Sequence, residues 1–190
     1  MKQITDEANK KYPCRAQEQY HPIPIGTYGQ RLKEAKMKPT YEEMIKFMKA
    51  YFKAYNDHAQ NPATVNKMTD YFTPDVHFIP YISAFGGPEN GAVTSRDDFF
   101  HMFTGHPSVY EKFENIEDIV VDERRMVATA LLHVALYESK TDKMLLRKHY
   151  LPRYQLVLDE NNTIKISRIL FFWEATPPEV DAAYAIDTLE

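Results

Sequence analysis

The sequence predicts a single α+β domain in which helices come first and a mostly antiparallel sheet follows. Apolar residues recur at steps of three and four over residues 40–72 and again over residues 95–105, which is the period of amphipathic helices. From residue 110 onward the apolar period becomes that of strands, with turn residues at 122–124, 138–142 and 159–162. A chain of 190 residues is also within the usual length of one domain.

The first helix is predicted to begin after Thr40, because Glu43 follows three residues later and completes a capping box. Its apolar positions share one face, while lysine and glutamate occupy the other. The segment Asn56-Asp57-His58 is expected to end this helix. The predicted core face consists of Tyr41, Met44, Ile45, Met48, Tyr51, Phe52 and Tyr55.

Two shorter helices and one strand are expected next. Asn61-Pro62 supplies the cap and first-turn proline of a second helix that carries Val65, Met68, Tyr71 and Phe72. Residues 76–82 are rich in strand formers, and Pro80 makes this an edge strand because proline donates no ladder hydrogen bond. A third helix is expected to start at the cap residue Ser95 and to stop at Gly105.

Four long antiparallel strands are predicted in the second half, at residues 110–121, 126–137, 144–158 and 163–174. Residues 126–136 are apolar on both alternating faces, whereas a sheet with one wet face carries polar residues at every second position. Helices can cover only one face of this sheet. We therefore expect a homodimer in which a second copy of the chain covers the other face.

The bulk composition narrows the class of protein. The formal net charge of −4 and the scattered basic residues argue against nucleic-acid binding. The single cysteine, Cys14, excludes an internal disulfide, and no zinc-type Cys/His spacing occurs, so we expect neither a metal nor a cofactor. The sequence has no signal peptide and no apolar run of membrane-spanning length, which predicts a cytoplasmic protein without membrane contact. Residues 1–39 are predicted to form an extended arm, residues 40–175 the domain and residues 176–190 a tail.

The order of elements resembles the nuclear transport factor 2-like superfamily, which includes ketosteroid isomerase, scytalone dehydratase and the SnoaL-like polyketide cyclases. The resemblance covers about residues 40–174 and is carried by the sequence YFKAYNDH at residues 51–58 and by YFTPDV at residues 71–76. It implies a cone-shaped barrel, with three helices packed in the concave face of a strongly curved, mostly antiparallel sheet. It also implies an internal apolar pocket. Such a fold hosts unrelated functions, so the resemblance by itself does not name an activity.

The resemblance to ketosteroid isomerase suggests roles for individual residues. Tyr51 stands where that family has its oxyanion tyrosine, and Tyr154 stands where it has the aspartic acid of a Pro-x-Asp motif. The catalytic base of the family corresponds to Pro80, which has no ionisable group. Asp57 matches the acidic residue that the dehydratase branch places near the end of the first helix. The histidine of that branch has no counterpart at residues 111–113.

Two further groups of residues complete the predicted site. His77 and His101 are candidate proton carriers near the pocket mouth, because histidine titrates near neutral pH. A pocket for a small hydrophobic molecule would be lined by Tyr55, Phe78, Tyr81, Phe103 and Trp173.

The sequence is compatible with three functions. The first is a cofactor-independent lyase, isomerase or cyclase that transfers a proton on a hydrophobic carbonyl compound. The second is a non-catalytic module that binds a small ligand or serves in an assembly, which the missing base at Pro80 favours. The third is a purely structural dimer, whose pocket would be filled by its own side chains.

Overall fold

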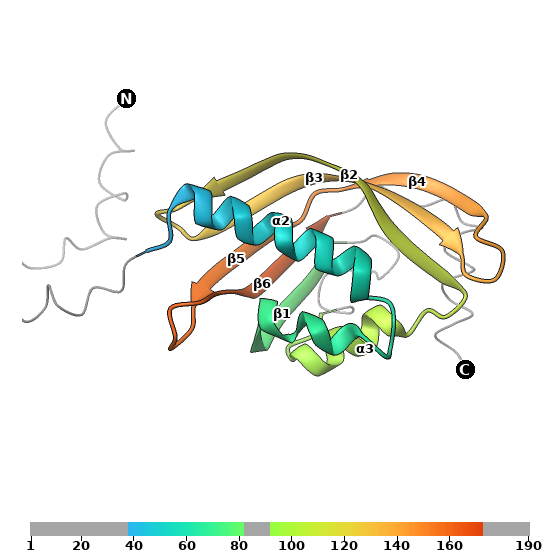
Figure 1. Ribbon diagram of the computed structural model, residues 1–190, viewed down its shortest axis with the longest axis horizontal. Coiled ribbons are helices and arrows are strands. Elements are labelled where there is room, and N and C mark those ends of the chain that lie inside the picture. The colour runs from blue at the N-terminus through green and yellow to red at the C-terminus, as the bar shows by residue number, and fades with distance from the viewer. Residues whose placement is uncertain (1–37, 82–91, 173–190) are drawn as a thin grey trace, which may run out of the picture. The chain divides into compact units, whose positions relative to one another are not determined.

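A computed structural model describes residues 38–81 and 92–172 of the chain, and these residues form helices on one face of a curved sheet (Figure 1). The described residues contain two α-helices, one 3₁₀ helix and six strands. Their order is α2 (Tyr41–His58), η3 (Val65–Tyr71), β1 (Phe72–Tyr81), α3 (Arg96–Thr104), β2 (Val109–Asp122), β3 (Val127–Glu138), β4 (Met144–Tyr150), β5 (Arg153–Leu158) and β6 (Ile164–Phe172). The predicted α+β class is confirmed.

Helix α2 begins and ends where the sequence predicted. The Thr40 side chain accepts a hydrogen bond from the Glu43 backbone N–H, and the Glu43 side chain accepts one from the Thr40 backbone N–H. The last helical residue is His58. Because the apolar positions lie on one side, Met44, Met48, Tyr51, Phe52 and Tyr55 are all buried.

The predicted second helix is only partly correct. It is a 3₁₀ helix of seven residues, and it ends at Tyr71 rather than continuing through Phe72. Phe72 instead begins β1, four residues before the predicted start of that strand at Val76. The reason is pairing: Phe72 is the register partner of Ile166 in β6, and this long-range contact overrides the local helical pattern.

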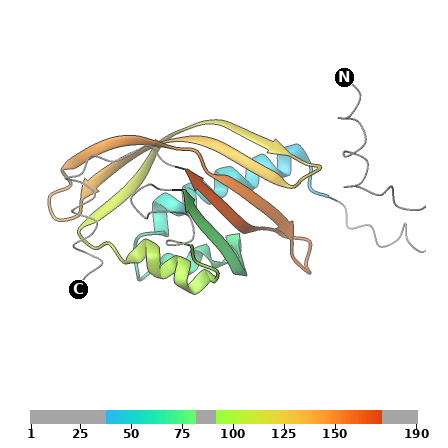
Figure 2. The same ribbon diagram turned by 180° about the vertical axis from the view of Figure 1, so that it is seen from behind.

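The sheet has the strand order β1-β6-β5-β3-β2, and β4 pairs with β3 outside this path. Strand β1 pairs with β6 in parallel and lies at one end of the order, as the edge position predicted from Pro80 requires (Figure 2). The other pairings are antiparallel. Among the described strands, β1 and β2 end the path without pairing with each other, so the sheet does not close into a barrel.

One predicted strand, residues 144–158, is in fact two. Strand β4 ends at Tyr150 and β5 begins at Arg153, with Leu151 and Pro152 between them. Both parts pair with β3, but β4 pairs with its second half and β5 with its first residues. The proline explains the break, because it removes a backbone donor from the ladder.

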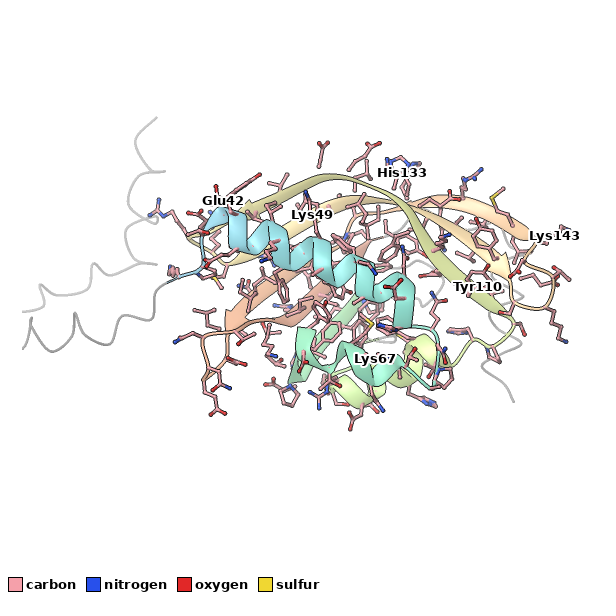
Figure 3. The ribbon with its side chains drawn as sticks, in the orientation of Figure 1. Glu42, Lys49, Lys67, Tyr110, His133 and Lys143 are labelled. Atoms are coloured by element: carbon pink, nitrogen blue, oxygen red, sulfur yellow. The ribbon has the colours of Figure 1, made fainter. Side chains whose placement is uncertain are left out.

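The core lies between the helices and the concave face of the sheet. Every second residue of β3 is buried there, from Ala128 through Leu132 to Leu136. The intervening residues face the outer side, where most of them are half-buried. Figure 3 shows His133 on this outer side, pointing away from the helices. The predicted homodimer through this face stays a prediction.

No helix in the described part of the chain is long and apolar enough to cross a membrane. The predicted arm at residues 1–39 and the predicted tail at residues 176–190 lie outside the described residues, apart from residues 38 and 39. The predicted pocket residue Trp173 also lies outside them.

Candidate functional site

Glu111 in β2 is the centre of a group of polar side chains on the inner face of the sheet. One of its carboxylate oxygens accepts a hydrogen bond from the Tyr55 hydroxyl at 3.1 Å, and the other accepts a short hydrogen bond from the Tyr150 hydroxyl. Tyr55 and Tyr150 are buried, whereas Glu111 is half-buried. A carboxylate held by two phenols on one side, and reachable on another, can take a proton from a bound molecule.

The end of α2 fixes the backbone on which Glu111 stands. Strand β2 ends the sheet order, so its free edge presents unpaired backbone groups. The Gln60 amide satisfies two of them: it accepts from the Glu111 N–H at 2.6 Å and donates to the Glu111 carbonyl at 2.7 Å. The Asn56 amide makes the same pair of bonds with Phe113, both at 2.9 Å. These two side chains, called here the edge clamp, replace a neighbouring strand over residues 111–113.

Six aromatic side chains form a circuit that begins and ends at Glu111. Tyr55 contacts Phe103 with ring centroids 5.2 Å apart, and Phe103 contacts Phe99 at 4.2 Å. The circuit continues from Phe99 to Phe78 at 5.0 Å and from Phe78 to Phe171 at 5.5 Å. Phe171 lies 4.8 Å from Tyr150, whose hydroxyl returns to Glu111. The two phenols that bind Glu111 are therefore joined to each other through a continuous series of packed aromatic rings.

The structure brings together the two predicted oxyanion residues, Tyr51 and Tyr154. Their rings lie 5.5 Å apart, both side chains are 2% exposed, and their hydroxyls share a hydrogen bond. Burial raises the pKa of Tyr51, and the hydrogen bond with Tyr154 lowers it by a smaller amount. Burial also raises the pKa of Tyr154 well above its usual value, with a further contribution from Tyr51. Both phenols are thus neutral donors in the core.

The three predicted proton carriers lie apart from these phenols. Asp57 is exposed and forms an ion pair with Lys53 at 2.5 Å, one turn earlier in α2. That hydrogen bond, together with the Lys53 charge, lowers the pKa of the Asp57 carboxyl. His77 and His101 are exposed. His77 lies between the buried residues Val76 and Phe78 of β1, so the alternation of the strand turns its side chain away from the core.

Four of the five predicted pocket residues lie in the described part of the chain. Tyr55, Phe78 and Phe103 belong to the aromatic circuit that begins and ends at Glu111. Tyr81 is 42% exposed and stacks on Phe172 at 4.6 Å, so it lies outside the circuit. No group of three or more histidine, cysteine or acidic side chains suited to a metal ion occurs within residues 38–81 and 92–172.

Sequence reasoning missed Glu111 and Tyr150 as site residues. Tyr150 had an available signal, because it lies two residues before Pro152 and four before Tyr154, and these even-numbered positions share a face of the strands. Glu111 was noted only as a position at which the dehydratase histidine is absent. The structure shows that a carboxylate occupies this position and accepts hydrogen bonds from two phenols.

Comparisons with known proteins support the fold and leave the activity open. No family model and no curated protein matches the sequence. Among solved structures, a nuclear transport factor 2-like protein from Anabaena variabilis is similar, with a TM-score of 0.54 and 12% identity over 74% of this chain and 96% of that one. AusH from Aspergillus nidulans has a TM-score of 0.51 and 14% identity over 73% and 88% of the two chains. A proposed polyketide cyclase from Xanthomonas campestris has a TM-score of 0.53 and 14% identity over 77% and 97%.

Proposed function

We propose that this chain, which has the fold of the nuclear transport factor 2-like superfamily, is a cofactor-independent enzyme of the lyase, isomerase or cyclase type. Its substrate would be a small hydrophobic carbonyl compound, and its reaction a proton transfer next to the carbonyl group. The observation that carries the proposal is the half-buried Glu111 carboxylate, held by two phenols that both belong to the aromatic circuit.

Glu111 acts as the general base in this proposal. Its carboxylate takes the proton from the carbon next to the carbonyl, the C–H electron pair becomes a carbon–carbon double bond, and the carbonyl π pair moves to oxygen to give an enolate. From a β,γ-unsaturated ketone the anion is a dienolate, and the protonated Glu111 returns the proton to its γ carbon, which is isomerisation. Where the β carbon carries a leaving group, the enolate electrons form a double bond between the α and β carbons, the bond to the leaving group breaks, and that group takes the proton, which is elimination.

The phenols have two different tasks. Tyr55 and Tyr150 each occupy one carboxylate oxygen of Glu111, so they orient the base while each oxygen keeps a second lone pair for the substrate. Tyr51 and Tyr154 are also buried, and they hydrogen-bond each other. We assign them to the support of Tyr55, whose ring lies 6.4 Å from that of Tyr51.

Deuterium exchange tests the proposal without knowledge of the natural substrate. The protein is incubated in heavy water with 2-tetralone, a bicyclic ketone, and deuterium uptake next to the carbonyl is followed by NMR. We expect exchange on the order of 100-fold above the rate with Glu111→Gln, since a positioned base contributes about 10²–10⁴-fold. Glu42→Gln is the matched control, because Glu42 is exposed in the first turn of α2. Equal rates for wild type and Glu111→Gln would refute the assignment of the base.

A second candidate function is non-catalytic binding of a small apolar ligand. The observation that favours it is Pro80, which is buried in β1 at the position of the isomerase base and cannot accept a proton. In that case a ligand at a hundred times its dissociation constant stabilises the fold by about 2.7 kcal/mol. The ketone would then bind with no exchange above that of the Glu111→Gln variant.

A further inference from the structure

Lys148 is the one charged residue that is buried in the described part of the chain, with 4% of its surface exposed. It lies in β4 between Arg147 and His149, which are both exposed. Its register partner in β3 is Val134, a core residue, so Lys148 faces the inner side of the sheet. Burial of an ammonium group costs free energy, and such groups are retained mainly where their charge is used.

The Lys148 ammonium and the proposed base both interact with Tyr150. Its nitrogen is 5.1 Å from the centroid of the Tyr150 ring, within the range of a cation–π contact. The hydroxyl of the same ring donates to Glu111. One phenol therefore has a cation over its face and a carboxylate at its hydroxyl, and both charged groups belong to the concave side of the sheet.

We propose that Lys148 stabilises the negative charge that forms on the substrate oxygen, and that the site consequently prefers enolate anions to neutral ketones of the same shape. The inference rests on the proposed function. When Glu111 takes the proton it becomes neutral, and the negative charge moves from the carboxylate to the enolate oxygen. A fixed ammonium that is shielded from water stabilises such a charge far more than a solvated one does.

The charge balance explains why a cation is needed at this place. Before proton transfer, Lys148 and Glu111 carry opposite charges in one half-buried region. After transfer, the same two charges remain but the negative one lies on the substrate. Without Lys148, the enolate would be an uncompensated anion among the rings of Phe78, Phe103 and Phe171.

A pair of probes that differ in charge tests this preference. Cyclohexane-1,3-dione is an enolate anion at neutral pH, and its methyl ether, 3-methoxycyclohex-2-enone, is neutral with the same ring. Binding of each to the full chain is measured by titration calorimetry. We expect the wild type to bind the anion at least tenfold more tightly than the ether.

Four variants locate the cause. Lys148→Met is expected to abolish the preference for the anion. Lys148→Arg keeps the positive charge and is expected to keep the preference, so this variant separates the loss of charge from an effect on folding. Lys112→Met is the matched control, since Lys112 is exposed next to Glu111 in β2. Glu111→Gln, which mimics the protonated base, should increase the preference for the anion.

The binding measurements test the role of Lys148, and they do so separately from the test of the proposed function. A preference that survives Lys148→Met, equal binding of the two probes by the wild type, or binding of neither would overturn the role of Lys148. The proposed function is tested separately, because the deuterium exchange compares the wild type with Glu111→Gln and leaves Lys148 unchanged in both.

Discussion

Replacement of Asn56 by alanine tests whether the edge clamp holds β2 against the helix. The Asn56 amide makes two hydrogen bonds of 2.9 Å with the backbone of Phe113, at the end of the sheet order. In the variant, the N–H and carbonyl of Phe113 lose these partners. The site of the proposed base is two residues away, so the same substitution also reports on the frame of Glu111.

The expected loss of folding stability follows from the number of hydrogen bonds removed and from their exposure to water. Each hydrogen bond contributes about 1 kcal/mol net, which gives roughly 2 kcal/mol for the pair. Alanine is a better helix former than asparagine by about 0.5 kcal/mol, and this offsets part of the loss. Because the Asn56 residue is exposed, water can replace some of the contact. We therefore expect the free energy of unfolding to fall by about 1–1.5 kcal/mol.

Urea denaturation followed by circular dichroism measures this change. Lys49→Ala is the control, since Lys49 is exposed on α2 (Figure 3) and its replacement changes helix propensity alone. Gln60→Ala should cost a similar amount, and it should also slow deuterium exchange, because Gln60 holds the backbone of Glu111 itself. If Asn56→Ala were no less stable than Lys49→Ala, the two Asn56 hydrogen bonds would not contribute to stability and the edge clamp would be refuted.

Two other predictions concern the core phenols and the outer face. The pKa values of Tyr51 and Tyr154 are raised by burial above the unfolded value of about 10, so the unfolded chain loses these protons first and stability should fall as the pH rises above about 10. In urea titrations at pH 8 and 10.5, the variant Tyr154→Phe should show a smaller loss between the two pH values than the wild type, and an equal loss would contradict the sign. For the proposed homodimer, Leu131→Lys on the outer side of β3 should convert a dimer into a monomer in analytical ultracentrifugation. A wild type that is already monomeric would refute the proposed homodimer.

The helical half of the fold was predictable because its signals are local. The capping box at Thr40 and the cap residue Ser95 each satisfy donors within three residues, and both helices begin there in the structure. The failure at Phe72 has the opposite cause. Its partner in β6 is Ile166, nearly a hundred residues later, and no local pattern contains that contact.

The resemblance to ketosteroid isomerase predicted part of the site. It placed Tyr51 and Tyr154 at two positions of the isomerase site, and the two rings are in contact in the core. The exposed candidates Asp57, His77 and His101 illustrate a limit of residue type as evidence, because an ionisable side chain near a helix end or on an edge strand is usually solvated. Neither the position of a residue relative to a family motif nor its type indicates which carboxylate faces the core.

The face of Glu111 depends on an irregularity in β2 that alternation cannot reveal. Phe113 pairs with Val134 and Asn115 pairs with His133, so an extra residue, Glu114, lies between the two registers. Before this point the odd-numbered residues face the core, and after it Ile116 does, opposite Leu132. Alternation extended backward from Ile116 would turn Lys112 inward and Glu111 outward, the reverse of what the structure shows. A deletion of Glu114 would restore strict alternation and leave both Glu111 and Ile116 facing the core, so the variant should retain deuterium exchange.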